Sequence, residues 1–214
     1  MKFLYFIFSN LNAIILGFWI LFLFVVSIRF FRPSWVKNIS YLKLSFIAGG
    51  VHVAYSIFVT WGQYYVWSIS SDITKALLKL PLSKEAPLPN FLEWSRNLVF
   101  DGHLGYFLYY VLGRIWFYTL LLFLTAIFFY LIFRIWKFYR GGFMEKGPEF
   151  LLVLMLVSGW PNIFVCISLG FSISILYLLF AYLFNKKTIQ IEPFFIISTM
   201  LALLFTKLIL IYLL

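Results

Sequence analysis

Long apolar runs separated by short basic or polar stretches dominate the pattern along this chain. About 20 apolar residues cross the ~30 Å hydrocarbon core of a bilayer, where a lone segment must be helical to pair its own backbone groups. Six runs, of which the fourth is short, are predicted to span a membrane: Phe3–Ile28, Leu44–Ser68, Leu104–Phe133, Phe150–Ser158, Ile163–Phe184 and Phe194–Leu214. The pattern predicts an all-α membrane protein, a polytopic bundle of about six transmembrane helices forming one domain over residues 1–214.

The fourth run is joined to the fifth through Gly159, Trp160 and Pro161, followed by Asn162. Proline cannot continue a helix from the preceding turn without losing a backbone hydrogen bond, and glycine permits a sharp change of direction. We therefore expect the fourth and fifth helices to form a tight hairpin at this point.

The external loop from residue 69 to residue 103 contains two amphipathic stretches, Ser71–Leu80 and Asn90–Phe100. The first begins with capping residues and ends at Pro81, while Asn90 and Glu93 have the spacing of a capping box. We expect two short helices in the membrane interface, with their apolar sides toward the acyl chains. The alternative is a lid over an external cavity.

Composition and charge support this picture. With 64% hydrophobic and 11% charged residues, a soluble globular protein is excluded. The net charge of +10 is explained by topology rather than by nucleic acid, because basic residues are retained in cytoplasmic loops. The first, third and fifth loops carry the excess of Lys and Arg, which predicts that both termini lie outside. The expected partners are the lipid bilayer and other membrane proteins, with no nucleic acid.

Three ionisable residues, His52, Arg114 and Lys207, lie within the apolar runs. Burying a charge in hydrocarbon costs at least ~2.5 kcal/mol, so such residues are candidates for function. His52 is also explained by a neutral ring hydrogen-bonded across helices, and the two cations by side chains that reach outward. A small transporter or channel using His52 and Arg114 remains an alternative, although no acidic residue in the membrane could complete an ion-pair relay.

No cluster of His, Cys and carboxylate residues has metal-binding spacing, and no glycine-rich loop could hold a phosphate, so neither metal nor cofactor is expected. The single cysteine, Cys166, is interpreted as a small packing residue. By the charge rule Glu149 and Glu192 lie inside, whereas Asp72 lies outside.

Residues 146–214 contain Lys146-Gly147-Pro148-Glu149, then Gly159-Trp160, the basic pair Lys186-Lys187, and Ile191-Glu192-Pro193-Phe194-Phe195. In order and spacing this third of the chain resembles the C-terminal half of the type IV prepilin peptidases, which are membrane aspartyl peptidases. It is also similar to small membrane proteins of reduced-genome bacteria. The resemblance implies a bacterial inner membrane and a carboxylate pair, for which Glu149, Glu192 and Asp72 are the candidates.

The chain departs from that family at the positions that matter for catalysis. Glu149 stands where the family has its second catalytic Asp, and Asp72 is predicted on the opposite side of the membrane. Two carboxyls separated by a bilayer cannot share a proton. Glu149 is also explained by its place in a first helical turn, beside the positive end of the helix dipole. The favoured interpretation is a non-catalytic membrane protein packed with partner subunits, and a prepilin-type peptidase is the alternative.

Overall fold

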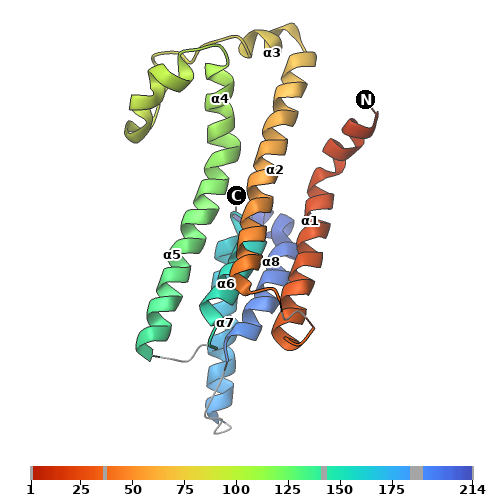
Figure 1. The fold of residues 1–214 in the computed structure, drawn as a ribbon, viewed down its shortest axis with the longest axis vertical. Helices are drawn as coiled ribbons and strands as arrows, with labels where there is room; N and C mark the ends of the chain where they lie inside the picture. Colours follow the sequence, from red (N-terminus) through yellow and green to blue (C-terminus); the bar gives the residue numbers. More distant parts are fainter. Residues whose placement is uncertain (1, 36–37, 141–143, 184–189, 214) are drawn as a thin grey trace. The chain divides into compact units, whose positions relative to one another are not determined.

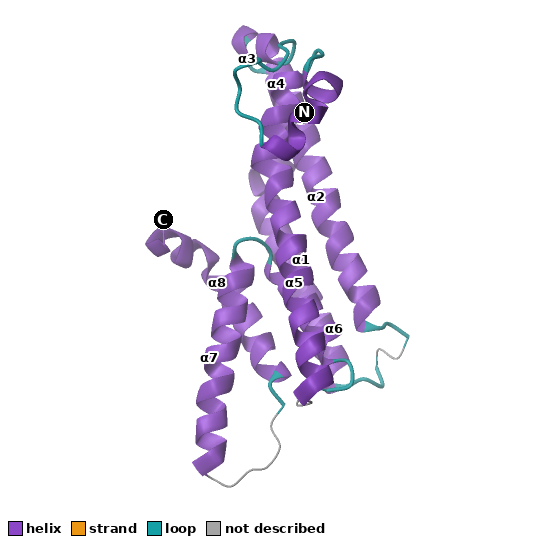
Figure 2. Cartoon of the chain, turned by 90° about the vertical axis from the view of Figure 1, so that its left-hand side faces the viewer, coloured by secondary structure: helices purple, strands orange, loops and turns teal. Residues whose placement is uncertain are grey.

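The computed structural model describes residues 2–35, 38–140, 144–183 and 190–213, with the backbone alone for 2–9, 90–92, 140 and 206–213. All regular structure in these residues is helical, as Figures 1 and 2 show. The α-helices are α1 (Lys2–Phe31), α2 (Tyr41–Ile69), α3 (Asp72–Leu77), α4 (Gly105–Val111), α5 (Phe117–Arg140), α6 (Gly147–Ser158), α7 (Asn162–Leu183) and α8 (Glu192–Leu213).

Four helical stretches are long and apolar enough to cross a membrane, which supports a membrane location. They are Asn10–Phe31, Tyr41–Ile69, Gly105–Tyr139 and Asn162–Leu183, with 22, 29, 35 and 22 residues. The third combines α4, a π-helical turn, Leu112–Trp116, and α5. It is longer than its apolar run because α5 continues beyond Phe133. Two further apolar helices, α6 and the part of α8 up to Phe205, are shorter. The all-helical prediction is thus confirmed, with four membrane-length helices in the described part of the chain.

The contacts within the chain group into two units, residues 1–51 with 121–214 and residues 52–120. In the first unit α6 is the most enclosed helix, since all of its residues except Glu149 are buried. Its Phe150 ring lies 4.7 Å from the ring of Phe30 and 5.2 Å from that of Tyr41. Aromatic contacts therefore join the first turn of α6 to the end of α1 and the start of α2.

Helices α7 and α8 make a second close contact in this unit. Gly170 of α7 lies so near Phe195 of α8 that a Cβ atom added to the glycine would be 2.7 Å from the phenylalanine ring. Phe195 is fully buried and also contacts Phe171 and Phe133, at ring distances of 5.5 and 6.2 Å. The missing side chain of Gly170 is what allows the two helices to approach here.

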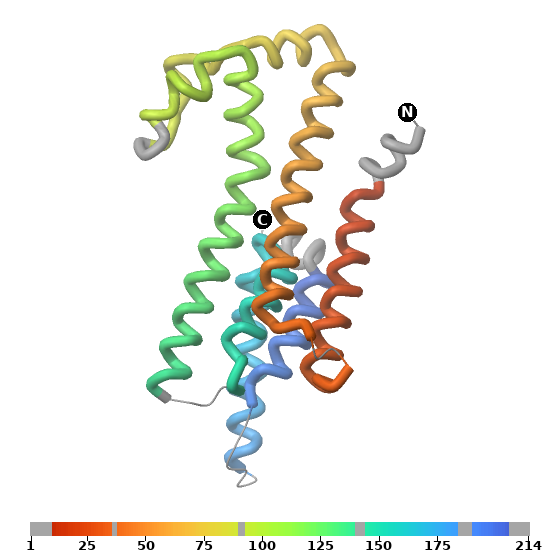
Figure 3. Tube along the Cα trace, viewed as in Figure 1, coloured from red at the N-terminus to blue at the C-terminus, as the bar shows by residue number. Residues whose placement is uncertain are grey.

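The predicted break between the fourth and fifth runs is confirmed. Helix α6 ends at Ser158, Gly159 has a φ of 72°, and α7 begins at Asn162. The turn between them can be followed along the trace in Figure 3. A left-handed φ is costly for residues with a Cβ, so glycine at position 159 suits this turn.

In the second unit, the end of α2 packs against α4. Trp67 contacts the rings of Phe107 and Tyr110, at 5.4 and 5.0 Å. Between α2 and the start of α5, the hydroxyl groups of Ser56 and Thr119 lie 2.7 Å apart. These contacts hold the second half of α2 beside the helix that begins at Gly105.

The loop between these helices contains both predicted short helices, in altered form. Ser71 caps α3 in a capping box with Thr74, as expected, but α3 ends already at Leu77. Residues 90–100 form a 3₁₀ turn, Asn90–Ser95, followed by a π-helical turn, Arg96–Phe100. The 3₁₀ turn begins after Pro89 without a side-chain cap, and both carboxylate oxygens of Glu93 accept hydrogen bonds from Arg96. The side chain of Asn90, the other residue of the expected capping box, lies outside the described residues.

Candidate functional site

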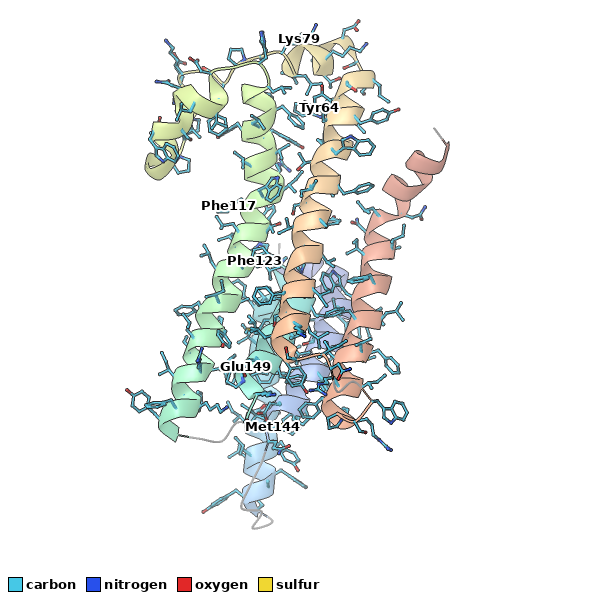
Figure 4. All side chains as sticks on the ribbon, viewed as in Figure 1. Tyr64, Lys79, Phe117, Phe123, Met144 and Glu149 are labelled. Carbon is cyan, nitrogen blue, oxygen red and sulfur yellow. The ribbon has the colours of Figure 1, made fainter. Side chains whose placement is uncertain are left out.

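Glu149 lies in the first turn of α6, directly after Pro148. Proline suits this position because the first amides of a helix have no partner within it, and the helix dipole favours a negative charge there. No side-chain hydrogen bond caps α6, and Oε2 of Glu149 is buried without a partner among the described residues. Figure 4 shows Glu149 and Met144 near the beginning of α6. The structure thus gives this carboxylate a helix-terminal position while leaving one oxygen unpaired.

Glu192 is the first residue of α8, where it is fully buried. Its Oε1 accepts a hydrogen bond from the amide of Met144 at 2.6 Å, whereas its Oε2 has no partner in the described part of the chain. Buried carboxylates are normally hydrogen-bonded at both oxygens, because desolvation of an unpaired polar atom is costly. Glu192 links the start of α8 to the segment before α6.

An open pocket of about 590 Å³ lies beside Glu149, within the first unit. The last three turns of α5 and the start of α6 line it, through Leu131, Arg134, Ile135, Lys137, Phe138, Tyr139, Pro148 and Glu149. The Lys137 ammonium group donates a hydrogen bond to the carbonyl of Glu145, and Arg134 makes a long one, 3.4 Å, to the Tyr130 hydroxyl. Two cations and one carboxylate therefore meet at one pocket, which the sequence did not indicate.

The other candidate carboxylate, Asp72, belongs to the second unit. It is exposed in the first turn of α3 and forms an ion pair with Lys75 at 3.2 Å. No hydrogen bond or ion pair with Glu149 or Glu192 involves an Asp in the described residues. The carboxylate pair implied by the resemblance stays a prediction.

The ionisable residues of the apolar runs lie in different surroundings. His52 is partly buried on α2, and its carbonyl accepts a hydrogen bond from the Ser56 hydroxyl. Arg114 is exposed in the π-helical turn before α5, with its guanidinium 5.9 Å from the centre of the Tyr110 ring. The side chain of Lys207 lies outside the described residues. None of the three lines the pocket beside Glu149.

Cys166 lies in a buried polar cluster between α7 and α8. Its Sγ is 3.1 Å from Oγ1 of Thr199 and 3.7 Å from Oγ of Ser198, and the residue is fully buried. Thr199 also donates to the carbonyl of Phe195. Small polar side chains commonly join membrane helices in this way, so the cluster is a packing contact. It matches the interpretation of Cys166 as a packing residue.

Arg96 holds the loop of the second unit through hydrogen bonds, a role that we did not expect from the sequence. Its guanidinium donates to both oxygens of Glu93 and to the carbonyls of Ser83 and Ala86, at distances of 2.8 to 3.0 Å. These hydrogen bonds hold the pKa of Glu93 below its ordinary value. The only signal in the sequence was the spacing of three between the two charges, which suits a pair on one helical face.

The described residues contain no group of three or more His, Cys, Asp or Glu side chains that could hold a metal ion. Glu149 and Glu192 are the described acids that each have one buried oxygen without a hydrogen-bond partner. In comparisons with known proteins, no family model, no curated protein sequence and no solved structure matches this chain. The resemblance to prepilin peptidases stays a prediction.

Proposed function

We propose that this chain is a multi-pass integral membrane protein without catalytic activity, which packs against partner membrane subunits. The observation that carries the proposal is Asn12, an exposed amide on the apolar helix α1 with no hydrogen bond to any described residue. It lies roughly 15 Å from the start of that helix. An amide facing hydrocarbon is costly, and membrane helices commonly satisfy such groups through hydrogen bonds to a neighbouring helix.

The exposed apolar surface of the first unit supports the same conclusion. Large side chains such as Leu124, Phe128 and Leu131 are about half exposed or more. Surfaces of this kind need lipid or another apolar protein surface around them.

Purification from native membranes tests the partner. We expect a stoichiometric membrane protein to copurify with the wild-type chain and to be lost from Asn12→Leu, which removes the amide at similar volume. Asn38→Leu, the same substitution at an exposed amide in the turn after α1, is the matched control and should retain the partner. A wild-type chain that purifies alone, or a partner retained equally by Asn12→Leu, would contradict the proposal.

We further propose six passes, with both termini and the loop from residue 69 to residue 103 outside. The alternation of basic loops favours this arrangement. Helix α6 is short for a span, roughly 18 Å, but it is enclosed by protein, where a short apolar helix is tolerated. In this arrangement the turns of residues 90–100 lie in the outer interface, since Trp94 and Leu98 are 72% and 78% exposed.

Sidedness of single cysteines tests these passes, because the native Cys166 is buried. An impermeant maleimide should label Ser83→Cys and Trp160→Cys from outside, and Ser34→Cys and Glu145→Cys only after the membrane is opened. Labelling of Trp160→Cys from the same side as Glu145→Cys would show that α6 does not cross.

A peptidase is the second candidate, favoured by the unpaired buried oxygens of Glu149 and Glu192. It requires that both carboxylates act on a peptide bond, so Glu149→Gln and Glu192→Gln should each abolish cleavage of a prepilin-type substrate. If the wild-type chain does not cleave such a substrate in vesicles, this alternative is rejected.

A further inference from the structure

The pocket beside Glu149 lies where a membrane-length helix ends. The stretch Gly105–Tyr139 is roughly 50 Å long, well beyond the ~30 Å of a hydrocarbon core. Its end carries the exposed aromatic residues Trp136 and Tyr139, which are typical of the membrane interface. If the chain spans a membrane as proposed above, the pocket lies at the depth of the lipid headgroups.

The α5 side of the pocket is positively charged. Arg134 is exposed, and among the described residues its guanidinium makes one long hydrogen bond, so most of its N–H donors are available to a ligand. Lys137 donates one hydrogen bond to Glu145, and an ammonium group has two more to offer. Basic pockets between membrane helices bind the phosphate of lipid headgroups.

The α6 side of the same pocket carries a carboxylate. Glu149 lines the pocket while its Oε2 is sealed from it, so a ligand would meet this side chain at Oε1. A purely anionic ligand would be repelled by Glu149, whereas a zwitterionic one would use both charges. An ethanolamine headgroup has this chemistry, because its phosphate precedes a primary ammonium group with three hydrogen-bond donors.

Apolar surface continues from the pocket along α5. Leu131 and Ile135 line it at 49% and 57% exposure, and Phe138 is 83% exposed. These side chains could receive the first carbons of acyl chains, which a soluble phosphate ester lacks. We propose that this pocket binds an ethanolamine phospholipid, with the phosphate toward Arg134 and Lys137 and the ammonium toward Glu149.

Native mass spectrometry of the full chain in detergent tests the proposal. The probes are phosphatidylethanolamine, phosphatidylglycerol and phosphatidylcholine with identical acyl chains. We expect phosphatidylethanolamine to bind more tightly than the other two, because trimethylation removes the donors of choline and glycerol has no cation. Equal binding of phosphatidylethanolamine and phosphatidylcholine would overturn the proposal.

Charge variants separate the two ends of the headgroup. Arg134→Gln should weaken binding of all three phospholipids about fivefold, whereas Glu149→Gln should reduce only the preference for phosphatidylethanolamine, by about two- to fivefold. Lys43→Gln, an exposed cation of the same unit outside the pocket, should change neither. An unchanged preference in Glu149→Gln, with Cys166 still protected from maleimide as a sign of folding, contradicts the assignment.

A soluble competitor identifies the source of the phosphate. Phosphoethanolamine, which lacks acyl chains, should not displace the phospholipid at equal concentration if the apolar surface of α5 contributes. Equal competition would show that the ligand is a soluble phosphate ester and would overturn the lipid assignment. Neither result depends on a partner subunit or on the number of passes, so failure here is distinguishable from failure of the proposed function.

Discussion

The interactions that stabilise each unit internally differ between the two units of this protein. In the first, α6 is surrounded by apolar and aromatic side chains, and the contacts of Phe150 and Phe195 join helices far apart in the chain. In the second, the loop before α4 is held by hydrogen bonds, including Leu82 to Phe100 at 2.9 Å and those of Arg96. Close-packed apolar side chains leave no room for atoms to move, so a change of side-chain volume in the first unit is costly. The loop of the second unit depends instead on a few hydrogen bonds, whose strength falls when their geometry changes.

Phe150→Ala should cause the largest effect, because it removes a fully buried ring that joins α6 to α1 and α2. Large-to-small changes at such positions cost about 3–5 kcal/mol. The reporter is Cys166, whose buried thiol reacts with maleimide only when the first unit opens, so its labelling during heating should begin at lower temperature. Phe128→Ala, at a position 59% exposed, is the control and should leave the labelling temperature nearly unchanged. Equal shifts in the two variants would show that α6 is not the packed centre.

Gly105→Ala should disrupt the loop of the second unit. The added methyl group would overlap the carbonyl oxygen of Phe100 and lie 2.8 Å from the amide of Leu82. These two groups are hydrogen-bonded, so the backbone must move, at a cost of about 3 kcal/mol. Limited proteolysis within residues 83–89 should become faster. Gly102→Ala, where nothing lies within 4 Å of an added Cβ, should be cleaved like the wild type.

Gly170→Ala tests the contact of α7 with α8 and should cost about 1–2 kcal/mol, less than the loss of Phe150 because the Phe195 ring can tilt. Cys166 labelling again gives the measurement. Gly50→Ala is matched to it, since position 50 is exposed in the helix α2 and open around an added Cβ. It should be neutral or slightly stabilising. A neutral Gly170→Ala would mean that the two helices approach less closely than described.

The smallest effect is expected from the ion pair of Glu93 and Arg96, because its carboxylate partner is exposed to solvent. The pKa of Glu93 is lowered in the folded state, so its contribution to stability is present above the ordinary pKa of a glutamate. It is lost as the pH falls through the lowered value. Pepsin cleavage within residues 83–89 should therefore increase at the acid end in the wild type. Glu93→Gln keeps the Arg96 bonds to the carbonyls of Ser83 and Ala86 and removes only the titrating charge. It should be cleaved faster than the wild type above that range and lose the difference below it; a constant ratio of the two rates would refute the role of the pair.

Local patterns in the sequence predicted the helices well, because apolar run length, the Gly159–Pro161 break and the Ser71 cap act over a few residues. The same reasoning failed for residues 90–100, where Arg96 reaches back to the carbonyls of Ser83 and Ala86 and takes Glu93 from its expected capping role. It also missed the pocket beside Glu149. The basic residues Arg134 and Lys137 were recognised only as part of a cytoplasmic loop, since their meeting with Glu149 depends on how α5 and α6 pack.

The π-helical turn Leu112–Trp116 has a consequence for changes in chain length. Such a turn contains one more residue than the α-helical turns on either side. Deleting one residue there would turn the π-helical turn into an α-helical one. The side chains before and after it would keep the same faces of the helix toward their neighbours. The same deletion in the middle of α5 would rotate everything beyond it by about 100° relative to its neighbours. The helix should therefore accept a single-residue deletion at Gly113 and reject one at Leu122.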